Sequence, residues 1–264
     1  MKTNLDKQRE VWNALAGQWS NYRQKPWKDV EKAMNYLVRQ NAQKSGISGA
    51  KEITNFLDPR IAINSLAKEI IRFPGSLKAD AFTAPKTKGF CGKGRILDIG
   101  CGSGRNLLPF AKAGFDCYGI DFSEEMLKHA AEFGKTNKIK LKLKYGRAQF
   151  IPFPTKSFDY AMSIAVLHHL KKEDHLRALS EMFRVLKNNG KAVITVWNHL
   201  NPKFFKFILK KEAFVPWKLN DQTYLRYYYF FSFWELKKLI RKAGFKILHS
   251  SSPFARNIAF IIGK

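Results

Sequence analysis

The segment LDIGCGSGRN, residues 97–106, places three glycines directly after a short apolar run and ahead of a helical pattern. Gly100, Gly102 and Gly104 allow the backbone to approach a ligand closely, and a helix N-terminus adds a favourable dipole. A dinucleotide site has the spacing G-x-G-x-x-G, which would put its third glycine at position 105, where this chain has arginine. The spacing therefore indicates a ligand-binding loop, preceded by the acidic residue Asp98, that is not a dinucleotide loop.

A second acidic residue closes the next apolar run. Asp121 directly follows the residues YGI and lies 23 positions beyond Asp98. A carboxylate at the end of a strand beside a glycine loop can accept hydrogen bonds from both hydroxyls of a ribose. The alternative role for such an aspartate is to cap a helix, but Ser123 already suits that position. The loop and the acid together predict a site for a nucleoside-bearing cofactor.

These residues need alternating strands and helices to bring them together. From Arg95 onward, short apolar runs alternate with stretches of helical spacing, which is typical of a parallel sheet with crossover helices, so the fold class is α/β. The predicted strands are RILDIG, FDCYGID, KLKLKYG near a sheet edge, FDYAMSIAV, KAVITVW, KILHSSS and NIAFIIGK. The predicted helices are SEEMLKHAAEFGK, with Ser123 as N-cap, KEDHLRALSEMFRVLKNNG, which ends on Gly190, and SFWELKKLIRKAGF.

The chain before this region is less regular. Residues 4–20 and 28–40 have helical patterns, whereas residues 41–94 contain glycines, prolines and one helical patch with no readable chemistry. Residues 41–94 are therefore an insertion, a lid or a surface that binds a partner. We therefore predict N-terminal helices in residues 1–40, an insertion in 41–94, and a cofactor-binding core in 95–264 with a substrate-side insertion at about 200–231.

The charge balance indicates a polyanionic partner. The chain has 47 Lys and Arg against 21 Asp and Glu, a formal net charge of +26 and a pI near 10.0. Nucleic acid is the usual partner of such a surface, because each neutralised phosphate releases condensed counterions. The alternative is that many of the lysines merely solvate helix faces.

Other composition features exclude several classes of protein. No stretch approaches eighteen consecutive apolar residues, and the start of the chain is polar, so we expect neither a membrane span nor a signal peptide, and a cytoplasmic location. The three cysteines, Cys91, Cys101 and Cys117, have no C-x-x-C spacing and are odd in number. We expect reduced thiols in packing roles and no metal site.

The G-x-G-x-G loop behind Asp98, with Asp121 at the end of the next strand, resembles the first motifs of the Rossmann-like class I S-adenosylmethionine-dependent methyltransferases. The resemblance implies a mostly parallel seven-stranded sheet with helices on both faces. It also implies that Asp98 and the loop backbone hold the methionine end of S-adenosylmethionine and Asp121 the ribose. The implied cofactor-binding residues are Asp98, Gly100, Cys101, Gly102, Gly104, Asp121, Phe122, Arg147, Ala148 and Ala165.

One of these positions departs from the family. Many relatives place an aspartate after the third strand, where it accepts a hydrogen bond from the adenine amino group, and Arg147 stands there in this chain. Arginine cannot accept a hydrogen bond. Either a backbone carbonyl or the side chain of Gln149 replaces it, or cofactor affinity is weak and depends on a partner.

Further segments resemble a narrower family, the eukaryotic and archaeal methyltransferases that esterify the carboxymethyl group on the wobble uridine of transfer RNA. The resemblance covers residues 11–40 and 95–264 and is carried by SNYRQKPW, MSIAVLHHL, FVPWKL, LRYYY and ARN, in that order. It implies transfer RNA as the partner and a methyl ester as the product. It also implies a small zinc-containing activator protein, for which the edge strand KLKLKYG is a candidate site, although alternating lysines also protect a free edge.

The chemistry of such an acceptor suggests which residues would serve it. A carboxylate with a solution pKa of about 4 is already ionised at neutral pH and needs cations and alignment rather than a general base. The predicted catalytic residues are Arg23, His168, Arg226 and Arg256, with His169 as a neighbour that could share the role of His168. Against these stand plainer roles: one histidine packs or caps, and Arg23 pairs with an acidic neighbour. Trp27 and Trp217 either pack the N-terminal helices or stack a base.

The stretch RYYYFF, residues 226–231, joins one arginine to five aromatic residues. In an extended segment over residues 224–231, alternate side chains point opposite ways, so that Arg226 and one tyrosine would face a flipped nucleotide while other rings enter the core. The alternative is that all five rings belong to the core of an antiparallel addition to the sheet. Two rival functions also remain: a methyltransferase of a small carboxylate or quinone precursor, and a non-catalytic RNA-binding scaffold.

Overall fold

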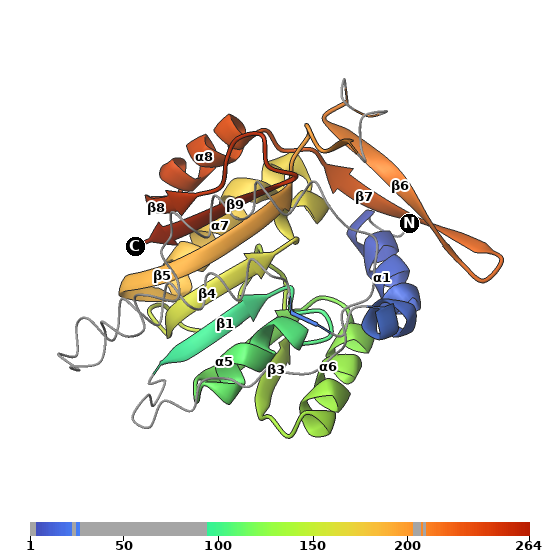
Figure 1. Ribbon diagram of the computed structural model, residues 1–264, viewed down its shortest axis with the longest axis horizontal. Coiled ribbons are helices and arrows are strands. Elements are labelled where there is room, and N and C mark those ends of the chain that lie inside the picture. The colour runs from blue at the N-terminus through green and yellow to red at the C-terminus, as the bar shows by residue number, and fades with distance from the viewer. Residues whose placement is uncertain (1–3, 23–24, 27–93, 203–206, 208–209) are drawn as a thin grey trace, which may run out of the picture. The chain divides into compact units, whose positions relative to one another are not determined.

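A computed structural model describes residues 4–22, 25–26, 94–202, 207 and 210–264, and within them a seven-stranded sheet forms the centre (Figure 1). The strand order is β3-β2-β1-β4-β5-β9-β8, and β9 alone runs antiparallel to its neighbours. The strands are β1 (Arg95–Ile99), β2 (Asp116–Asp121), β3 (Leu141–Tyr145), β4 (Phe158–Ile164), β5 (Leu186–Trp197), β8 (Lys246–Ser250) and β9 (Asn257–Gly263). The mostly parallel sheet expected from the sequence is confirmed.

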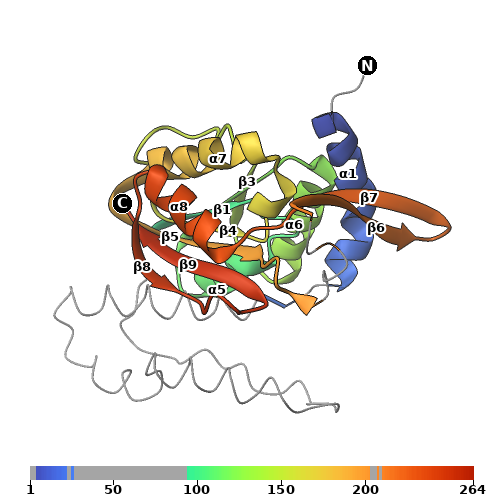
Figure 2. The same ribbon diagram turned by 90° about the horizontal axis from the view of Figure 1, so that it is seen from above.

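The strand order reverses between β1 and β4, because successive strands add outward on either side of that pair. Ligands of open α/β sheets bind at the carboxyl ends of the strands at such a point. Helices α7 (Lys172–Val185) and α8 (Phe233–Lys242) lie on one face of the sheet, and α5 (Leu108–Lys112) lies on the other (Figure 2). Helix α6 (Glu124–Thr136) packs on β2 and β3. Its N-cap is Ser123, as predicted, whose hydroxyl accepts a hydrogen bond from the Met126 N–H at 3.1 Å.

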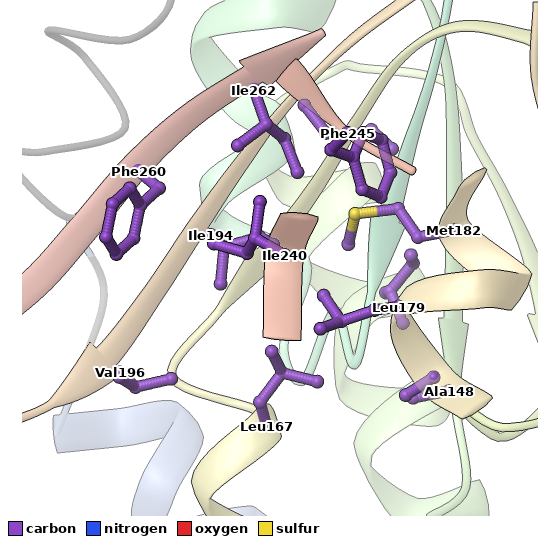
Figure 3. Close-up of a cluster of buried hydrophobic side chains, with 14 of the residues drawn as sticks. Ala148, Leu167, Leu179, Met182, Ile194, Val196, Ile240, Phe245, Phe260 and Ile262 are labelled. Atoms are coloured by element: carbon purple, nitrogen blue, oxygen red, sulfur yellow. The ribbon is translucent and has the colours of Figure 1, made fainter. Parts of the chain in front are cut away.

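The main core lies between the sheet and helices α7 and α8 (Figure 3). Ile194 and Val196 of β5 and Phe260 and Ile262 of β9 meet side chains of both helices there. These strands have few polar positions because one or both faces are covered, which is the usual pattern of strands in a parallel sheet.

Helix α7 ends earlier than the sequence pattern predicts. Its last residue is Val185, not Gly190, and β5 begins at once with Leu186. The pairing of β4 with β5 shifts register between Phe158 and Tyr160, so the residues LKNNG form an irregular start of the strand instead of a last helical turn. Asn189, at a φ of 65°, supplies the left-handed residue that this irregular stretch needs.

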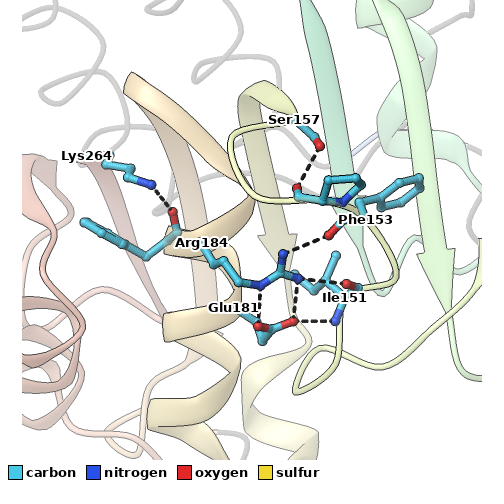
Figure 4. Close-up of polar contacts among 8 residues, drawn as sticks. Ile151, Phe153, Ser157, Glu181, Arg184 and Lys264 are labelled. Carbon is cyan, nitrogen blue, oxygen red and sulfur yellow. Dashed lines mark hydrogen bonds and ion pairs between the residues drawn. The ribbon is translucent and has the colours of Figure 1, made fainter.

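Helix α7 also holds the segment that follows β3 (Figure 4). The Arg184 guanidinium donates to the carbonyls of Ile151 and Phe153, both at 2.9 Å, and Glu181 accepts from the Ile151 N–H at 2.8 Å. Arg184 and Glu181 also pair with each other at 2.6 Å. These contacts hold Ile151 and Phe153 against the helix.

A separate antiparallel hairpin of β6 (Glu212–Leu219) and β7 (Gln222–Tyr229) stands beside helix α1 (Asn4–Tyr22) (Figure 1). The side chain of Gln8 pairs with the edge of β7: its oxygen accepts from the Tyr227 N–H at 3.0 Å, and its amide donates to the Leu225 carbonyl at 3.1 Å. Trp217 donates to Gln18 at 2.6 Å, so this tryptophan packs the hairpin on α1. The helix predicted over residues 4–20 is confirmed, and the extended segment predicted over 224–231 corresponds to β7 and the residues after it.

The rings of RYYYFF are all buried, none exposed by more than 4%. Tyr227, Tyr229 and Phe231 join the main core, while Tyr228 and Phe230 form a second cluster with the hairpin. All five rings are therefore core residues, but the strand that carries the tyrosines pairs with β6 in a separate hairpin and is not an addition to the main sheet. Tyr227 and Tyr228 also line the cavity described below.

Several predictions fall on other parts of the chain. The helix predicted over 28–40 and the insertion over 41–94 lie outside the described residues, as do Arg23, Trp27 and Cys91. Cys101 and Cys117 are buried free thiols. Among the described helices, none has the length and apolar character that a membrane crossing requires.

Candidate active site

A cavity of about 360 Å³ opens at the carboxyl ends of the central strands. It is lined by residues from α1, from the loops after β1, β2, β3 and β4, and from β5 and β7. Nine of the fourteen predicted site residues line it, together with His169 and Gln149: Gly100, Cys101, Gly102, Asp121, Phe122, Arg147, Ala148, Ala165 and His168. Asp98, Gly104 and Arg226 lie behind that lining, and Arg23 lies outside the described residues. Arg256 is exposed and also does not line the cavity.

The loop after β1 is held by backbone hydrogen bonds to the neighbouring strand. The N–H groups of Gly100 and Cys101 both donate to the Ile120 carbonyl, at 2.8 and 2.9 Å. Gly102 has a φ of 53°, and a Cβ built on it would meet nothing within 4 Å. Since Gly102 lines the cavity, this open space is room for a ligand to approach the backbone.

Asp121 closes β2 and is held by the turn that follows it. Its two oxygens accept from the N–H groups of Gly102 and Ser123, both at 2.9 Å. Burial raises the pKa of Asp121 to about 6, against backbone donors that lower it. The carboxylate faces the cavity with capacity for further donors, such as ribose hydroxyls.

Asp98, at the end of β1, is fully buried, and neither of its carboxylate oxygens has a hydrogen-bond partner in the described part of the chain. Burial, and next the charge of Asp121, raise the pKa of Asp98 to about 8, while Arg105 opposes them. An orphaned buried carboxyl is costly unless a ligand or solvent satisfies it. Its position behind the glycine loop fits a residue that supports the loop and its ligand.

Two histidines lie on the short helix η2 (Leu167–His169) after β4. The Trp197 N–H donates to Nδ1 of His168 at 3.3 Å, which leaves the proton of the neutral ring on Nε2. Nε2 is buried and has no hydrogen-bond partner among the described residues. Nδ1 of His169 lies 3.0 Å from the Tyr227 carbonyl and therefore carries its proton. His168 thus presents an N–H donor, and His169 a bare Nε2.

Both imidazoles are kept neutral. Burial, followed by the charges of His169 and Arg226, lowers the pKa of His168 well below 6.5. Burial lowers the pKa of His169 to about 3, and Arg226 contributes in the same direction. Neither ring is therefore suited to take a proton from an acceptor near neutral pH.

An aromatic stack forms the wall behind these histidines. His168 stacks on Trp197 and Tyr228 at ring separations of 5.0 and 5.4 Å, and the latter two rings stack at 4.7 Å. Arg226 is only 3% exposed, and its guanidinium lies 4.5 Å from the Trp217 ring centre and 5.2 Å from that of Tyr228. The structure therefore brings Arg226 to the rings around the cavity, as a fixed positive charge.

The sequence patterns did not identify α1 as part of the site. Gln8, Trp12 and Trp19 line the cavity, and Trp12 contacts His169 edge-on at 4.9 Å. The two tryptophans are seven residues apart, which places them on one face of a helix, so their spacing is a signal that could have found them. Asp174, at the start of α7, also lines the cavity, and no motif marks it.

Comparisons with known proteins agree with this geometry. Residues 97–194 match the methyltransferase domain family. The tRNA (carboxymethyluridine(34)-5-O)-methyltransferase of Schizosaccharomyces pombe is 30% identical over 178 residues, which cover 58% of this chain and 73% of that protein. A demethylmenaquinone methyltransferase of Renibacterium salmoninarum is 35% identical over 113 residues, covering 43% of this chain and 44% of the relative.

The fold is also that of solved methyltransferases. An S-adenosylmethionine-dependent methyltransferase of Methanosarcina mazei superposes with a TM-score of 0.56 at 23% identity, covering 65% of this chain and 92% of the other.

Proposed function

This chain belongs to the class I S-adenosylmethionine-dependent methyltransferases, and we propose that it methylates a carboxymethyl group on the wobble uridine of transfer RNA. The observation that carries this proposal is the way the two cavity histidines are held: the Trp197 N–H donates to Nδ1 of His168, and Nδ1 of His169 lies 3.0 Å from the Tyr227 carbonyl. Burial favours the neutral form of both rings. Nε2 of His168 therefore carries a hydrogen and offers a donor, while the low pKa of His169 makes its Nε2 a poor base. An acceptor that must first lose a proton finds no imidazole base here, whereas a carboxylate needs none.

The residues present fit S-adenosylmethionine. Gly102 leaves open space beside the backbone, Asp121 faces the cavity with a carboxylate, and Asp98 lies behind the loop. When bound, this cofactor supplies an electrophilic methyl group on a sulfonium. The chain's own part is to hold the acceptor oxygen in line with that group and to exclude water.

His168 is the residue that would orient the acceptor. Its Nε2–H can donate to one oxygen of a carboxylate and leave the other oxygen to react. The stack on Trp197 and Tyr228 keeps the ring in place, and the Trp197 N–H fixes the tautomer. Arg226, held among the aromatic rings, adds a positive field that favours an anionic acceptor.

Transfer RNA suits the rest of the molecule. The net charge of +26 far exceeds what a small neutral substrate would require, and it suits a polyanion. The relative that acts on carboxymethyluridine is matched over 73% of its length, and the demethylmenaquinone methyltransferase over 44%. On this basis Arg23 and Arg256 remain proposed contacts to RNA phosphate or carboxylate, and Arg256 does not line the cavity.

A zinc-containing activator protein is proposed as a second partner. Strand β3 forms one edge of the sheet, and no described strand pairs with its outer side. Tyr145, at the end of β3, is 38% exposed. A partner strand added there would extend the sheet and cover this surface. The outer edge of β3 and the acceptor end of the cavity lie on opposite sides of β2. An activator bound at β3 would therefore stabilise the enzyme without entering the active site.

The direct test uses two anticodon stem-loops that differ only at the wobble base. One carries 5-carboxymethyluridine and the other unmodified uridine, and both are incubated with methyl-labelled S-adenosylmethionine, with and without a co-purified activator. We expect label only in the carboxymethyl stem-loop, released as methanol by mild base because the product is an ester. Label in a demethylmenaquinone sample, with none in either RNA, would instead establish the small-molecule function.

A further inference from the structure

Gln149 and Asp174 form a hydrogen-bonded pair at the cavity that no motif assigns as a unit. The Gln149 side-chain amide donates to Oδ2 of Asp174 at 2.9 Å, and both residues line the cavity. Gln149 is 5% exposed and follows β3, whereas Asp174 lies in the first turn of α7. Among the described residues, Oδ1 of Asp174 has no hydrogen-bond partner.

The order of the strands shows which part of the cofactor reaches this pair. This inference rests on the proposed function, in which the reactive methyl lies near His168, which follows β4, and the ribose at Asp121, which follows β2. The strands run β3-β2-β1-β4 across the sheet, so a cofactor that extends from β4 past β2 places its base beyond Asp121. The lining residues on that side are those of the loop after β3, Gly146 to Gln149, with the start of α7.

Adenine presents an amino group on its outer edge, and this donor needs an acceptor when it is buried. Arg147 has no acceptor atom. The pair offers two acceptors, the neutral amide oxygen of Gln149 and Oδ1 of the Asp174 carboxylate, and hydrogen bonds to a carboxylate are the stronger. We propose that Asp174 accepts the hydrogen bond from the adenine amino group of S-adenosylmethionine, with Gln149 as the residue that positions it.

The pair is held rigidly enough to discriminate between bases. Arg184 and Glu181 of α7 clamp the segment after Gln149, and the Asp174 N–H closes the first turn of α7 on the Lys171 carbonyl at 3.0 Å. The N-terminal end of α7 also favours a carboxylate at this position over a neutral group. Asp174 is therefore placed to distinguish a base with an amino group from one with a carbonyl.

The experiment measures binding and requires no turnover. Calorimetry of the full chain compares S-adenosylhomocysteine with S-inosylhomocysteine, in which a carbonyl oxygen replaces the amino group. We expect the wild-type protein to prefer the adenine ligand by at least about tenfold, because an acceptor that faces a carbonyl oxygen is left unpaired. Equal affinities would overturn the proposal.

Variants then locate that preference. In Asp174→Ala, we expect affinity for S-adenosylhomocysteine to fall about 10- to 100-fold, as for one hydrogen bond to a charged group, with little change for the inosine ligand. In Asp174→Asn, Gln149 still donates to the side-chain oxygen, so the new NH2 group faces the base. This donor should narrow or reverse the preference for S-adenosylhomocysteine over S-inosylhomocysteine. Preservation of the wild-type preference in Asp174→Ala would overturn the assignment.

Two controls separate recognition from structural damage. Glu173→Ala removes the same charge from the same helical turn, at a side chain 70% exposed, and should leave both affinities within about twofold. Arg147→Asp in the Asp174→Ala background supplies an acceptor from the loop after β3 and should restore the preference for adenine. If Glu173→Ala matches Asp174→Ala for both ligands, the effect is one of helix charge and the proposal fails. Because no RNA is present, this outcome is independent of the acceptor proposed above.

Discussion

Substitution of two glycines in the same loop should separate folding from cofactor binding. A Cβ on Gly100 would lie 2.5 and 3.0 Å from the two methyl carbons of Val166, whereas a Cβ on Gly102 would meet nothing within 4 Å. Both glycines have positive φ, 72° and 53°, so alanine costs each position about 1 kcal/mol in backbone strain. The two variants therefore differ by the clash alone.

The size of that clash follows from the packing around η2. Overpacking a filled site typically costs about 1–3 kcal/mol. We therefore expect Gly100→Ala to lower the free energy of unfolding by about 3 kcal/mol and Gly102→Ala by about 1 kcal/mol. Gly102→Ala places its methyl group in the cavity and should weaken S-adenosylmethionine binding by at least about tenfold, equivalent to about 1.4 kcal/mol.

Urea denaturation of the chain without cofactor measures the stability differences, and calorimetry measures the affinity. A third variant, Gly100→Ala with Val166→Ala, removes both methyl carbons that clash and should recover about 1–2 kcal/mol relative to Gly100→Ala. Equal destabilisation by the two glycine variants would refute this account of the loop. So would a further loss of stability when Val166→Ala is added to Gly100→Ala.

Three other substitutions test the charges and donors of the site. His168→Phe keeps the ring stack but removes the N–H, so turnover on the RNA acceptor should fall about 100-fold while cofactor affinity stays unchanged. His175 is also a buried histidine but does not line the cavity, and His175→Phe should leave turnover near that of the wild type. Equal losses of turnover in the two variants would remove His168 from the site. Burial raises the pKa of Asp98 from 3.8 to about 8, so the unfolded chain binds fewer protons than the folded chain between those pH values. The free energy of unfolding should therefore decline as pH rises from about 4 to 8, by up to about 5 kcal/mol. Asp98→Asn should flatten this decline in a series of denaturation measurements, and an unchanged slope would contradict the assignment. Since burial raises the pKa of Asp121 to about 6, its carboxylate becomes protonated below that pH, and cofactor affinity should weaken as pH falls below 6. Calorimetry of Asp121→Asn should show weak cofactor binding without that pH dependence. A wild-type affinity that stays constant down to pH 5 would argue against the carboxylate as the ribose acceptor.

Much of the sheet could be predicted because its signals are local. The strands RILDIG and FDYAMSIAV are continuous apolar runs, and Ser123 caps its helix through a residue three positions away. The end of α7 could not be predicted from such signals. The sequence LKNNG is typical of the end of a helix, but Leu186 pairs with Phe158 of β4 and so belongs to the sheet. Hydrogen bonds to the neighbouring strand outweigh the weak helical preference of this segment.

The candidate site divides in the same way. The glycine loop and Asp121 could be predicted to lie together because each follows the end of its strand, and the structure places both at the carboxyl ends of the neighbouring strands β1 and β2. The substrate contact of Arg226 stays a prediction; the structure places its guanidinium 4.5 Å from the Trp217 ring centre and 5.2 Å from that of Tyr228, behind the lining of the cavity. Residue type alone does not tell whether a guanidinium binds a ligand or aromatic rings, since both satisfy it.

The amino-acid sequence by itself determined the α/β class, the glycine loop that lines the cavity and the basic character of the protein, because periodicity, short spacings and charge are properties of neighbouring residues. Only the tertiary structure decided that α1 lines the cavity beside Tyr227 and Tyr228 of β7, and that Asp174 also lines it. The Tyr227 N–H and the Gln8 side chain are 219 residues apart in the chain and 3.0 Å apart in space. Such contacts depend on the packing of whole elements, and no local pattern encodes which distant side chain fills the space beside a given strand.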